Sequence, residues 1–155
     1  MTGIPVTVTP ATAEGRIYPR YRNTIGILTL STQLPRPCSF GINIDGSLIL
    51  DFDEGGLLAS VELLLPMNQW RGKASTSPPR GSAANLLLAR ADRKSAEHKW
   101  PVTVSKNVQT GSGRVAIGNG DYNRAISLSE TCSALLLDYQ LTGFWFALGR
   151  ESKAP

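Results

Sequence analysis

The alternation of apolar and polar residues between positions 48 and 65 constrains the fold more than any other feature of the chain. It runs through LILDFDEGGLLASVELLL and is interrupted by a Gly-Gly pair. The positions on one face are Leu48, Leu50, Phe52, Leu57, Ala59, Val61, Leu63 and Leu65. Because successive side chains of a strand point to opposite faces, the pattern predicts a hairpin with one apolar face and one face that carries acids. The glycines supply the positive φ that a turn around residues 53–56 needs.

The rest of the chain favours more strands of the same kind. Fifteen glycines and ten prolines indicate many turns, which suits short strands better than long helices. Further strands are expected at 24–30, 125–130, 134–140 and 143–149, with a second hairpin over 101–118. We therefore expect a mostly β (α+β) fold, an antiparallel meander or sandwich-like sheet, in a single domain of 155 residues. Residues 1–23, which contain three prolines, are expected to form an extended N-terminal arm that includes an edge strand.

One helix is also predicted. The Pro/Gly/Ser-rich stretch 66–81 is expected to be a loop, and Ser82 follows it as a candidate N-cap. The next eighteen residues, AANLLLARADRKSAEHKW, are rich in Ala, Leu, Arg and Lys and stop at Pro101. This composition predicts a helix near 82–99.

Two segments resemble each other at an offset of 87 residues. LILDF at 48–52 matches LLLDY at 135–139, and the same offset carries Asp51 onto Asp138 and Gly56 onto Gly143. Either a duplication or two similar hairpins would explain the match. In both cases one apolar layer is expected to contain Phe52, Leu57, Val61, Tyr139, Phe144 and Leu148. Asp53 and Glu54 have no counterpart in the second copy and are expected to be exposed turn residues.

Charge is unevenly placed along a chain whose net charge is +4. Residues 41–66 hold five acids and no base, whereas residues 71–106 hold eight bases and two acids. The acids at 51, 53 and 62 match part of a calcium-binding EF-hand loop, but such a loop lies between helices and here both flanks alternate as strands. A solvated acidic face is favoured, and no metal site is expected.

Catalytic chemistry has few candidates in this sequence. His98 is the single histidine, and neither a nucleophile elbow nor a phosphate loop is present. The acid pairs of the hairpin would need a desolvated carboxyl to act as an acid or base. Cys38 and Cys132 are expected to be reduced, buried thiols rather than a disulfide. We expect no cofactor and no chemistry of the protein's own.

Two further regions of the sequence are candidate binding sites. The basic stretch 71–106 is bracketed by Trp70 and Trp100, so it is a candidate nucleic-acid surface through Arg71, Lys73, Arg90, Arg93 and Lys94. Trp145 alternates with Phe144 and Phe146, so it belongs either to a partner surface or to a second core. No apolar run approaches the roughly 20 residues of a membrane span, and no signal peptide is visible. We expect a soluble, cytoplasmic protein.

The stretch LDFDEGGLLASVELLLP at 50–66, with the opposed charges and the missing catalytic set, resembles bacterial toxin-immunity proteins of the contact-dependent inhibition type. The resemblance implies a protein that neutralises a cognate toxin by covering its active site. The resulting hypothesis is a non-enzymatic protein-binding protein. Its candidate partner-binding residues are Asp51, Asp53, Glu54, Glu62 and Trp145. The alternatives are a nucleic-acid-binding protein that uses 71–106 and an enzyme built on a carboxylate or on Cys132.

Overall fold

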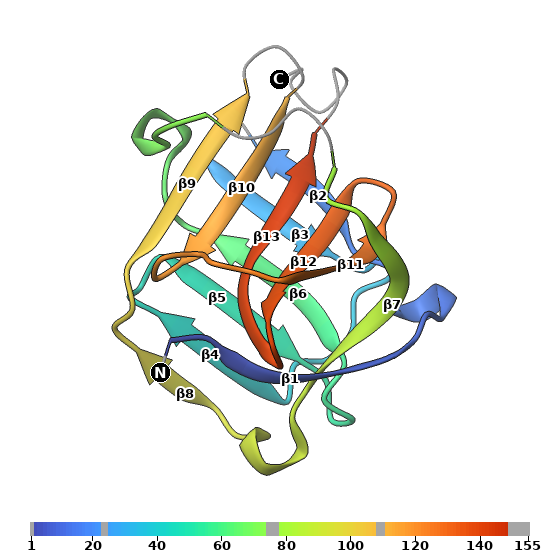
Figure 1. Cartoon of the computed structure of the whole chain (residues 1–155). Helices are drawn as coiled ribbons and strands as arrows, with labels where there is room; N and C mark the ends of the chain where they lie inside the picture. Colours follow the sequence, from blue (N-terminus) through green and yellow to red (C-terminus); the bar gives the residue numbers. More distant parts are fainter. Residues whose placement is uncertain (1, 23–24, 74–77, 108–110, 149–155) are drawn as a thin grey trace.

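The computed structural model describes residues 2–22, 25–73, 78–107 and 111–148, which form two β-sheets stacked face to face (Figure 1). In spatial order, the seven-stranded sheet contains β1 (Ile4–Pro10), β7 (Gly81–Leu88), β11 (Arg124–Ser129), β12 (Cys132–Leu137), β13 (Gln140–Ala147), β10 (Ser112–Ile117) and β9 (Val102–Asn107). The six-stranded sheet contains β2 (Tyr18–Arg22), β3 (Ile27–Ser31), β6 (Leu58–Leu63), β5 (Leu48–Phe52), β4 (Phe40–Ile44) and β8 (Ala96–His98). The predicted mostly β class is confirmed.

The hairpin predicted from the alternation is the β5–β6 pair, with one change of register. Asp51 lies opposite Ser60, but the next pair is Phe52 with Leu58, so β6 carries one extra residue at this point. Because side chains alternate along a strand, such a bulge moves the following residues of the strand to the opposite face of the sheet. Leu58 is consequently buried beside Phe52, while Leu57 is only half-buried.

The predicted helix near 82–99 is wrong. This stretch contains β7, the single 3-10 turn η3 (Arg90–Asp92) and β8. In β7 the side chains of Ala84, Leu86 and Leu88 are buried at every second position, which is the period of a strand. β7 pairs with β1 on one side and, in parallel, with β11 on the other. These long-range backbone pairings override the helix propensity of its Ala and Leu residues.

Helical structure in the described part of the chain is limited to three 3-10 turns: η1 (Ala13–Gly15), η2 (Met67–Gln69) and η3. Within the same residues, no helix is long and apolar enough to cross a membrane. The stretch 66–81 contains η2 and the start of β7, and its residues 74–77 lie outside the described ranges.

The N-terminal arm supplies one strand to each sheet. β1 pairs with β7 and also with β13, so β1, β7, β11, β12 and β13 close into a ring of five strands. β2 lies at one edge of the six-stranded sheet, beside β3. The chain that links β1 to β2 passes through η1, so this short arm ties the two sheets together at one corner.

The core lies between the two sheets, and Trp70 joins them. Its ring packs edge-on against Tyr21 of β2 at 6.1 Å between centroids and against Phe146 of β13 at 5.8 Å. Trp70 Nε1 donates a hydrogen bond to the Leu65 carbonyl at 2.9 Å, so its one polar group is satisfied within the protein.

The apolar layer expected from the two similar segments is confirmed in part. Phe52, Val61, Phe144 and Leu148 belong to one buried cluster. Tyr139 is 73% exposed, so its assignment to the layer is wrong. It sits with Asp138 in the two-residue turn between β12 and β13, where side chains point to solvent.

The matched Asp and Gly positions occupy different backbone environments. Asp51 is a strand residue of β5, whereas Asp138 is a turn residue with φ of 56°. Gly56 has φ of 87° in the β5–β6 turn, whereas Gly143 lies inside β13. The similarity at an offset of 87 residues therefore does not correspond to two copies of one local structure.

Candidate functional site

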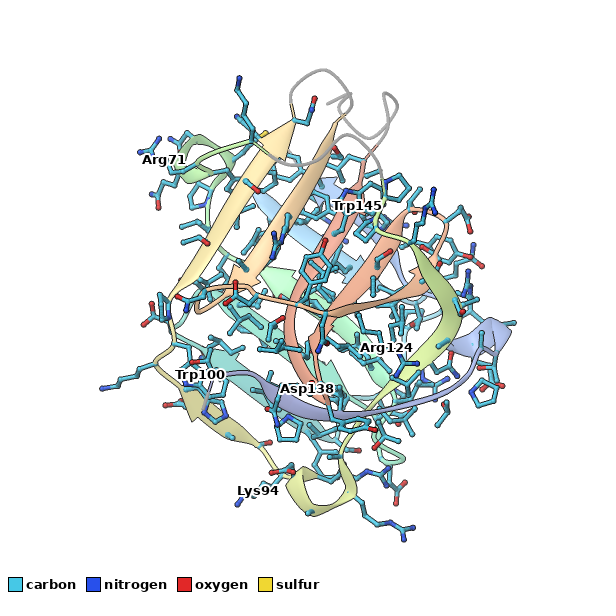
Figure 2. All side chains as sticks on the ribbon, in the orientation of Figure 1. Arg71, Lys94, Trp100, Arg124, Asp138 and Trp145 are labelled. Atoms are coloured by element: carbon cyan, nitrogen blue, oxygen red, sulfur yellow. The ribbon has the colours of Figure 1, made fainter. Side chains whose placement is uncertain are left out.

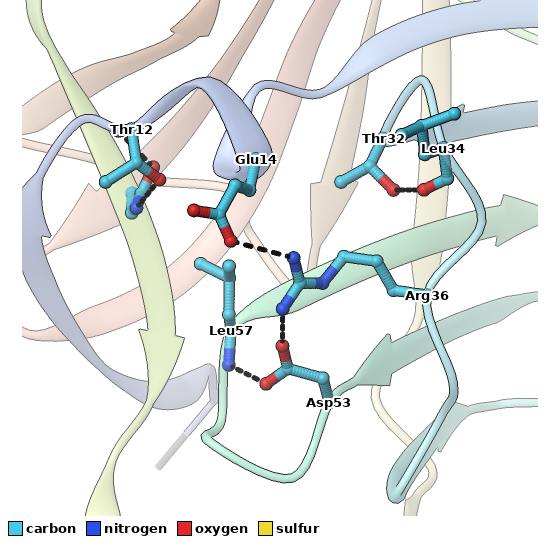
Figure 3. A network of polar contacts seen from close by, with 8 residues as sticks. Thr12, Glu14, Thr32, Leu34, Arg36, Asp53 and Leu57 are labelled. Atoms are coloured by element: carbon cyan, nitrogen blue, oxygen red, sulfur yellow. Dashed lines mark hydrogen bonds and ion pairs between the residues drawn. The ribbon is translucent and has the colours of Figure 1, made fainter.

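Asp53 forms the centre of a polar network at the β5–β6 turn (Figure 3). Arg36 donates a hydrogen bond to its Oδ2, and the Leu57 amide donates to Oδ1 at 2.9 Å. The other end of the Arg36 guanidinium lies 3.5 Å from a carboxylate oxygen of Glu14. Asp53 is only 9% exposed, so the expectation that it is an exposed turn residue is wrong. Glu54, its neighbour, is exposed as expected.

The Arg36 network is a set of contacts within the chain that stabilises the fold rather than a docking site. The hydrogen bond to Asp53 raises the pKa of Arg36 above its ordinary value, so the guanidinium stays charged at any physiological pH. Because η1 carries Glu14 and the β3–β4 connection carries Arg36, the network ties both segments to the turn. Both oxygens of Asp53 are already occupied by donors of the same chain, so this acid is not available to a partner.

Asp51 lies on the face of β5 that points away from the core and is also bound within the chain. The Cys38 thiol donates to its Oδ1 at 3.2 Å, and the Ser60 hydroxyl donates to Oδ2 at 3.1 Å. Cys38 is exposed and free, so the prediction that it is buried is wrong. Desolvation and then the hydrogen bond to Asp51 raise its thiol pKa. A raised pKa leaves little thiolate, which is the reactive form.

The second cysteine and the histidine do not assemble into a catalytic pair. Cys132 is fully buried in β12, as expected, and burial strongly raises its thiol pKa. His98 lies on β8 with its ring stacked flat on Trp100, 4.0 Å between centroids. No hydrogen bond between described residues joins His98 to either thiol. The described ranges also hold no group of three or more His, Cys, Asp or Glu side chains placed to bind a metal ion.

Trp145, a candidate partner-binding residue, is buried, with 4% of its surface exposed. It alternates in β13 with two core residues and therefore faces away from the shared core. Figure 1 shows the connection from β10 to β11 passing in front of β12 and β13. Two hydrogen bonds hold this connection across the sheet, from the Thr142 hydroxyl to the Asp121 carbonyl at 2.8 Å and from Arg114 to the Gly120 carbonyl.

The five candidate basic residues do not form one surface. Arg71 and Lys73 are exposed beside β9, whereas Arg90 and Lys94 are exposed at η3, and Figure 2 shows Arg71 and Lys94 at opposite ends of the molecule. Arg93 is half-buried and its Nε donates to the Leu88 carbonyl at 3.3 Å. Because β7 is extended and carries the chain along the length of the sheet, these candidate residues are divided into two separate groups, and a nucleic-acid surface that uses them stays a prediction.

The six-stranded sheet leaves the face opposite its core uncovered, and we call this the open face. Every residue that β2, β3, β6, β5 and β4 place on this face is half-buried or exposed. Two rows of residues cross these strands in the order β2, β3, β6, β5, β4. The first row is Arg20, Thr29, Glu62, Ile49 and Asn43, and the second is Tyr18, Ser31, Ser60, Asp51 and Gly41. Arg22 follows Arg20 on the same face of β2.

Charge divides the open face into two halves. Glu62 and Asp51 lie on β6 and β5, while Arg20 and Arg22 lie on the edge strand β2. Serine and threonine side chains of β3 and β6 separate the two halves. The sequence analysis selected the two acids but missed the two arginines. The alternation in YPRYR at 18–22 is the signal that places both arginines on one face.

No protein-family model matches the chain, and no curated protein matches it either. Its function is therefore inferred from the geometry of its own residues.

Proposed function

We propose that this chain is a non-enzymatic protein-binding protein and that the open face is its docking surface. The supporting observation is the uncovered sheet face itself, on which two acids and two arginines flank small hydroxyl side chains. A β-sheet holds these groups at fixed positions, so binding would require little ordering of the surface.

The charge pattern of the open face suggests the chemistry of the partner. Complementary charges steer encounter and select the correct partner more than they add affinity. A partner that fits would carry a basic patch opposite Glu62 and Asp51 and an acidic patch opposite Arg20 and Arg22. Exposed Glu54 at the β5–β6 turn extends the acidic half. Asp53 would contribute indirectly, because it holds that turn in place.

The resemblance of residues 50–66 to bacterial toxin-immunity proteins offers a specific partner. In that case the open face would cover the active site or substrate surface of a toxin domain, and its acidic half would meet basic residues of the toxin. Ile49, half-buried between the acidic half and β4, would lie near the centre of such a contact.

A photo-crosslinking amino acid at position 49 tests the proposal in an extract of the source cells. We expect a covalent adduct with one protein, which excess unmodified chain competes away. The matched control places the same amino acid at Glu130, an exposed turn residue between β11 and β12 in the other sheet. An adduct with the same protein in equal yield from position 130 would refute the open face as the docking surface.

The identified partner then allows a test of charge. Glu62→Lys is expected to slow association at low salt and to have much less effect at high salt, because exposed charges are screened. Glu130→Lys makes the same charge change away from the open face and should leave the association rate unchanged. Equal effects of the two substitutions in stopped-flow kinetics would show that only the net charge of the chain matters.

A further inference from the structure

A small polar hollow lies on the seven-stranded sheet, on the other side of the molecule's core from the open face. Its volume is about 190 Å³. The polar side chains that line it are Arg71, Thr103, Ser105, Arg114 and Asn119. They come from the segment after η2, from β9, from β10 and from the connection after β10. Arg71 is therefore brought beside the β9–β10 hairpin and the connection that follows it, which supply the other four side chains.

The donors around this hollow have few partners within the protein. Among the described residues, the side chains of Arg71, Thr103, Ser105 and Asn119 make no hydrogen bond or ion pair with another group. Side-chain donors that converge without partners are available to an outside acceptor. Arg71 is also positioned by its backbone, because its amide donates to the Val104 carbonyl of β9 at 2.6 Å.

Arg114 is the fixed member of the site. Its guanidinium lies 4.9 Å from the centroid of the Tyr122 ring and donates to the Gly120 carbonyl. Its Nε is buried and has no partner among the described residues. The indole nitrogen of Trp145, which lies directly opposite Arg114 in the neighbouring strand, is likewise buried and unpaired. Of these two residues Arg114 lines the hollow, so its Nε is a donor at this site for which the described chain supplies no acceptor.

The charge around the hollow favours an anion. No carboxylate lines it. Lys73, two residues after Arg71, adds a further positive charge to the segment that runs beside β9. Two guanidinium groups, two hydroxyls and one amide match the oxygens of a tetrahedral dianion better than those of a planar carboxylate. The volume suits a group of that size.

We propose that this hollow is a binding site for a phosphate group. Arg71 and Arg114 pair with its oxygens, and the hydroxyls of Thr103 and Ser105 donate to it. Asn119 closes the site from the β10–β11 connection. The site is independent of the protein-docking function, since the two faces belong to different sheets. The phosphate belongs either to a small molecule or to the backbone of a single-stranded nucleic acid.

Calorimetric titration with inorganic phosphate, at constant ionic strength in a chloride buffer, tests the site. Arg71→Gln removes one exposed guanidinium without disturbing the contacts that hold Arg114. We expect the affinity for phosphate to fall by about tenfold or more, since hydrogen bonds to charged groups are the strong ones. Arg90→Gln, an exposed arginine at η3, is the matched control and should bind phosphate like the unmodified chain.

A second titration, with a single-stranded DNA oligonucleotide followed by fluorescence anisotropy, identifies the source of the phosphate. If the ligand is a nucleic acid, affinity falls steeply with salt, and Arg71→Gln makes the slope of log K against log salt shallower by about 0.7. If the ligand is a small phosphate compound, Arg71→Gln and Arg90→Gln change the affinity for the oligonucleotide equally. The affinity for inorganic phosphate is then lowered only by Arg71→Gln. Equal responses of the two variants in both titrations would overturn the proposal.

Discussion

The two sheets share one core but differ on the faces that point away from it. On the six-stranded sheet these side chains are mostly polar, they are half-buried or exposed, and their charges fall into an acidic and a basic half. On the seven-stranded sheet the corresponding positions in β12 and β13 are buried, with Ser133 4% and Trp145 4% exposed. The β10–β11 connection crosses the second face, whereas the described chain leaves the first uncovered. The difference shows that a β-strand's second face is available for binding only where the rest of the chain leaves it free.

The largest expected effect of this difference is on Trp145. Trp145→Ala should lower the free energy of unfolding by about 3 to 5 kcal/mol, as for a core aromatic, although the residue faces away from the shared core. Ile49→Ala on the open face should cost about 1 kcal/mol or less, because its side chain is only partly removed from water. Urea unfolding of both variants measures these two losses in the free energy of unfolding. Similar losses at the two positions would mean that the two faces are equally covered.

Two strand glycines give the next contrast. A Cβ at Gly143 of β13 would overlap the Val115 carbonyl oxygen of β10, whereas a Cβ at Gly41 of β4 would meet only Asp51 Oδ1, at 3.6 Å. Gly143→Ala should therefore destabilise the fold by about 1 to 3 kcal/mol through overpacking. Gly41→Ala should be neutral or stabilise it by up to about 1 kcal/mol, since alanine restricts the unfolded chain. Thermal unfolding measures both variants. A lower melting temperature for Gly41→Ala than for Gly143→Ala would contradict the prediction.

The Arg36 network should contribute a similar amount at the corner where the sheets meet. Arg36→Met leaves the buried Asp53 carboxylate without its cation and should cost about 1 to 3 kcal/mol. The double variant Arg36→Met with Asp53→Asn should cost less than the sum of the two single changes, because each removes the same contact. Strictly additive losses in a double-mutant cycle would show that the ion pair contributes nothing to stability.

The smallest effect concerns the two cysteines: Cys38 lies beside Asp51 of the open face, and Cys132 lies in the shared core. Iodoacetamide should label Cys38 in the native protein and Cys132 only after unfolding, because Cys132 is fully buried. Native labelling of Cys38 should be slow near pH 8, since its raised pKa keeps the thiol protonated there. Asp51→Asn removes the negative charge that helps to raise this pKa, so the pH profile of labelling should shift to lower pH. Ser60→Ala leaves the charge in place and serves as the control.

Local pattern was sufficient for most of the strands. The hairpin of residues 48–65 and the three C-terminal strands follow from apolar alternation, which reports the strand period directly. The stretch 82–99 could not be assigned in this way, since Ala-Asn-Leu-Leu-Leu fits a helix as well as a buried strand. The pairing of β7 with β1 and with β11, both more than forty residues away along the chain, decided in favour of the strand.

The candidate site was predictable only in part. Glu62 and Asp51 were placed on one face by their spacing, and the structure puts them on the open face together with Arg20 and Arg22. Asp53 was misplaced because its partner Arg36 lies in a proline-bounded loop that carries no periodic signal. The phosphate-binding hollow was not predicted, since only the fold brings Arg71 beside Thr103, Ser105, Arg114 and Asn119.

The sequence by itself determined that this chain forms strands and which side chains of each strand share a face. It did so because a strand's period of two is a property of the local backbone. The tertiary structure decided which of the two faces is covered, and therefore that Trp145 is buried while Ile49 is not. Coverage depends on strand pairing and on loops that cross a sheet, and these contacts form between residues far apart in the chain.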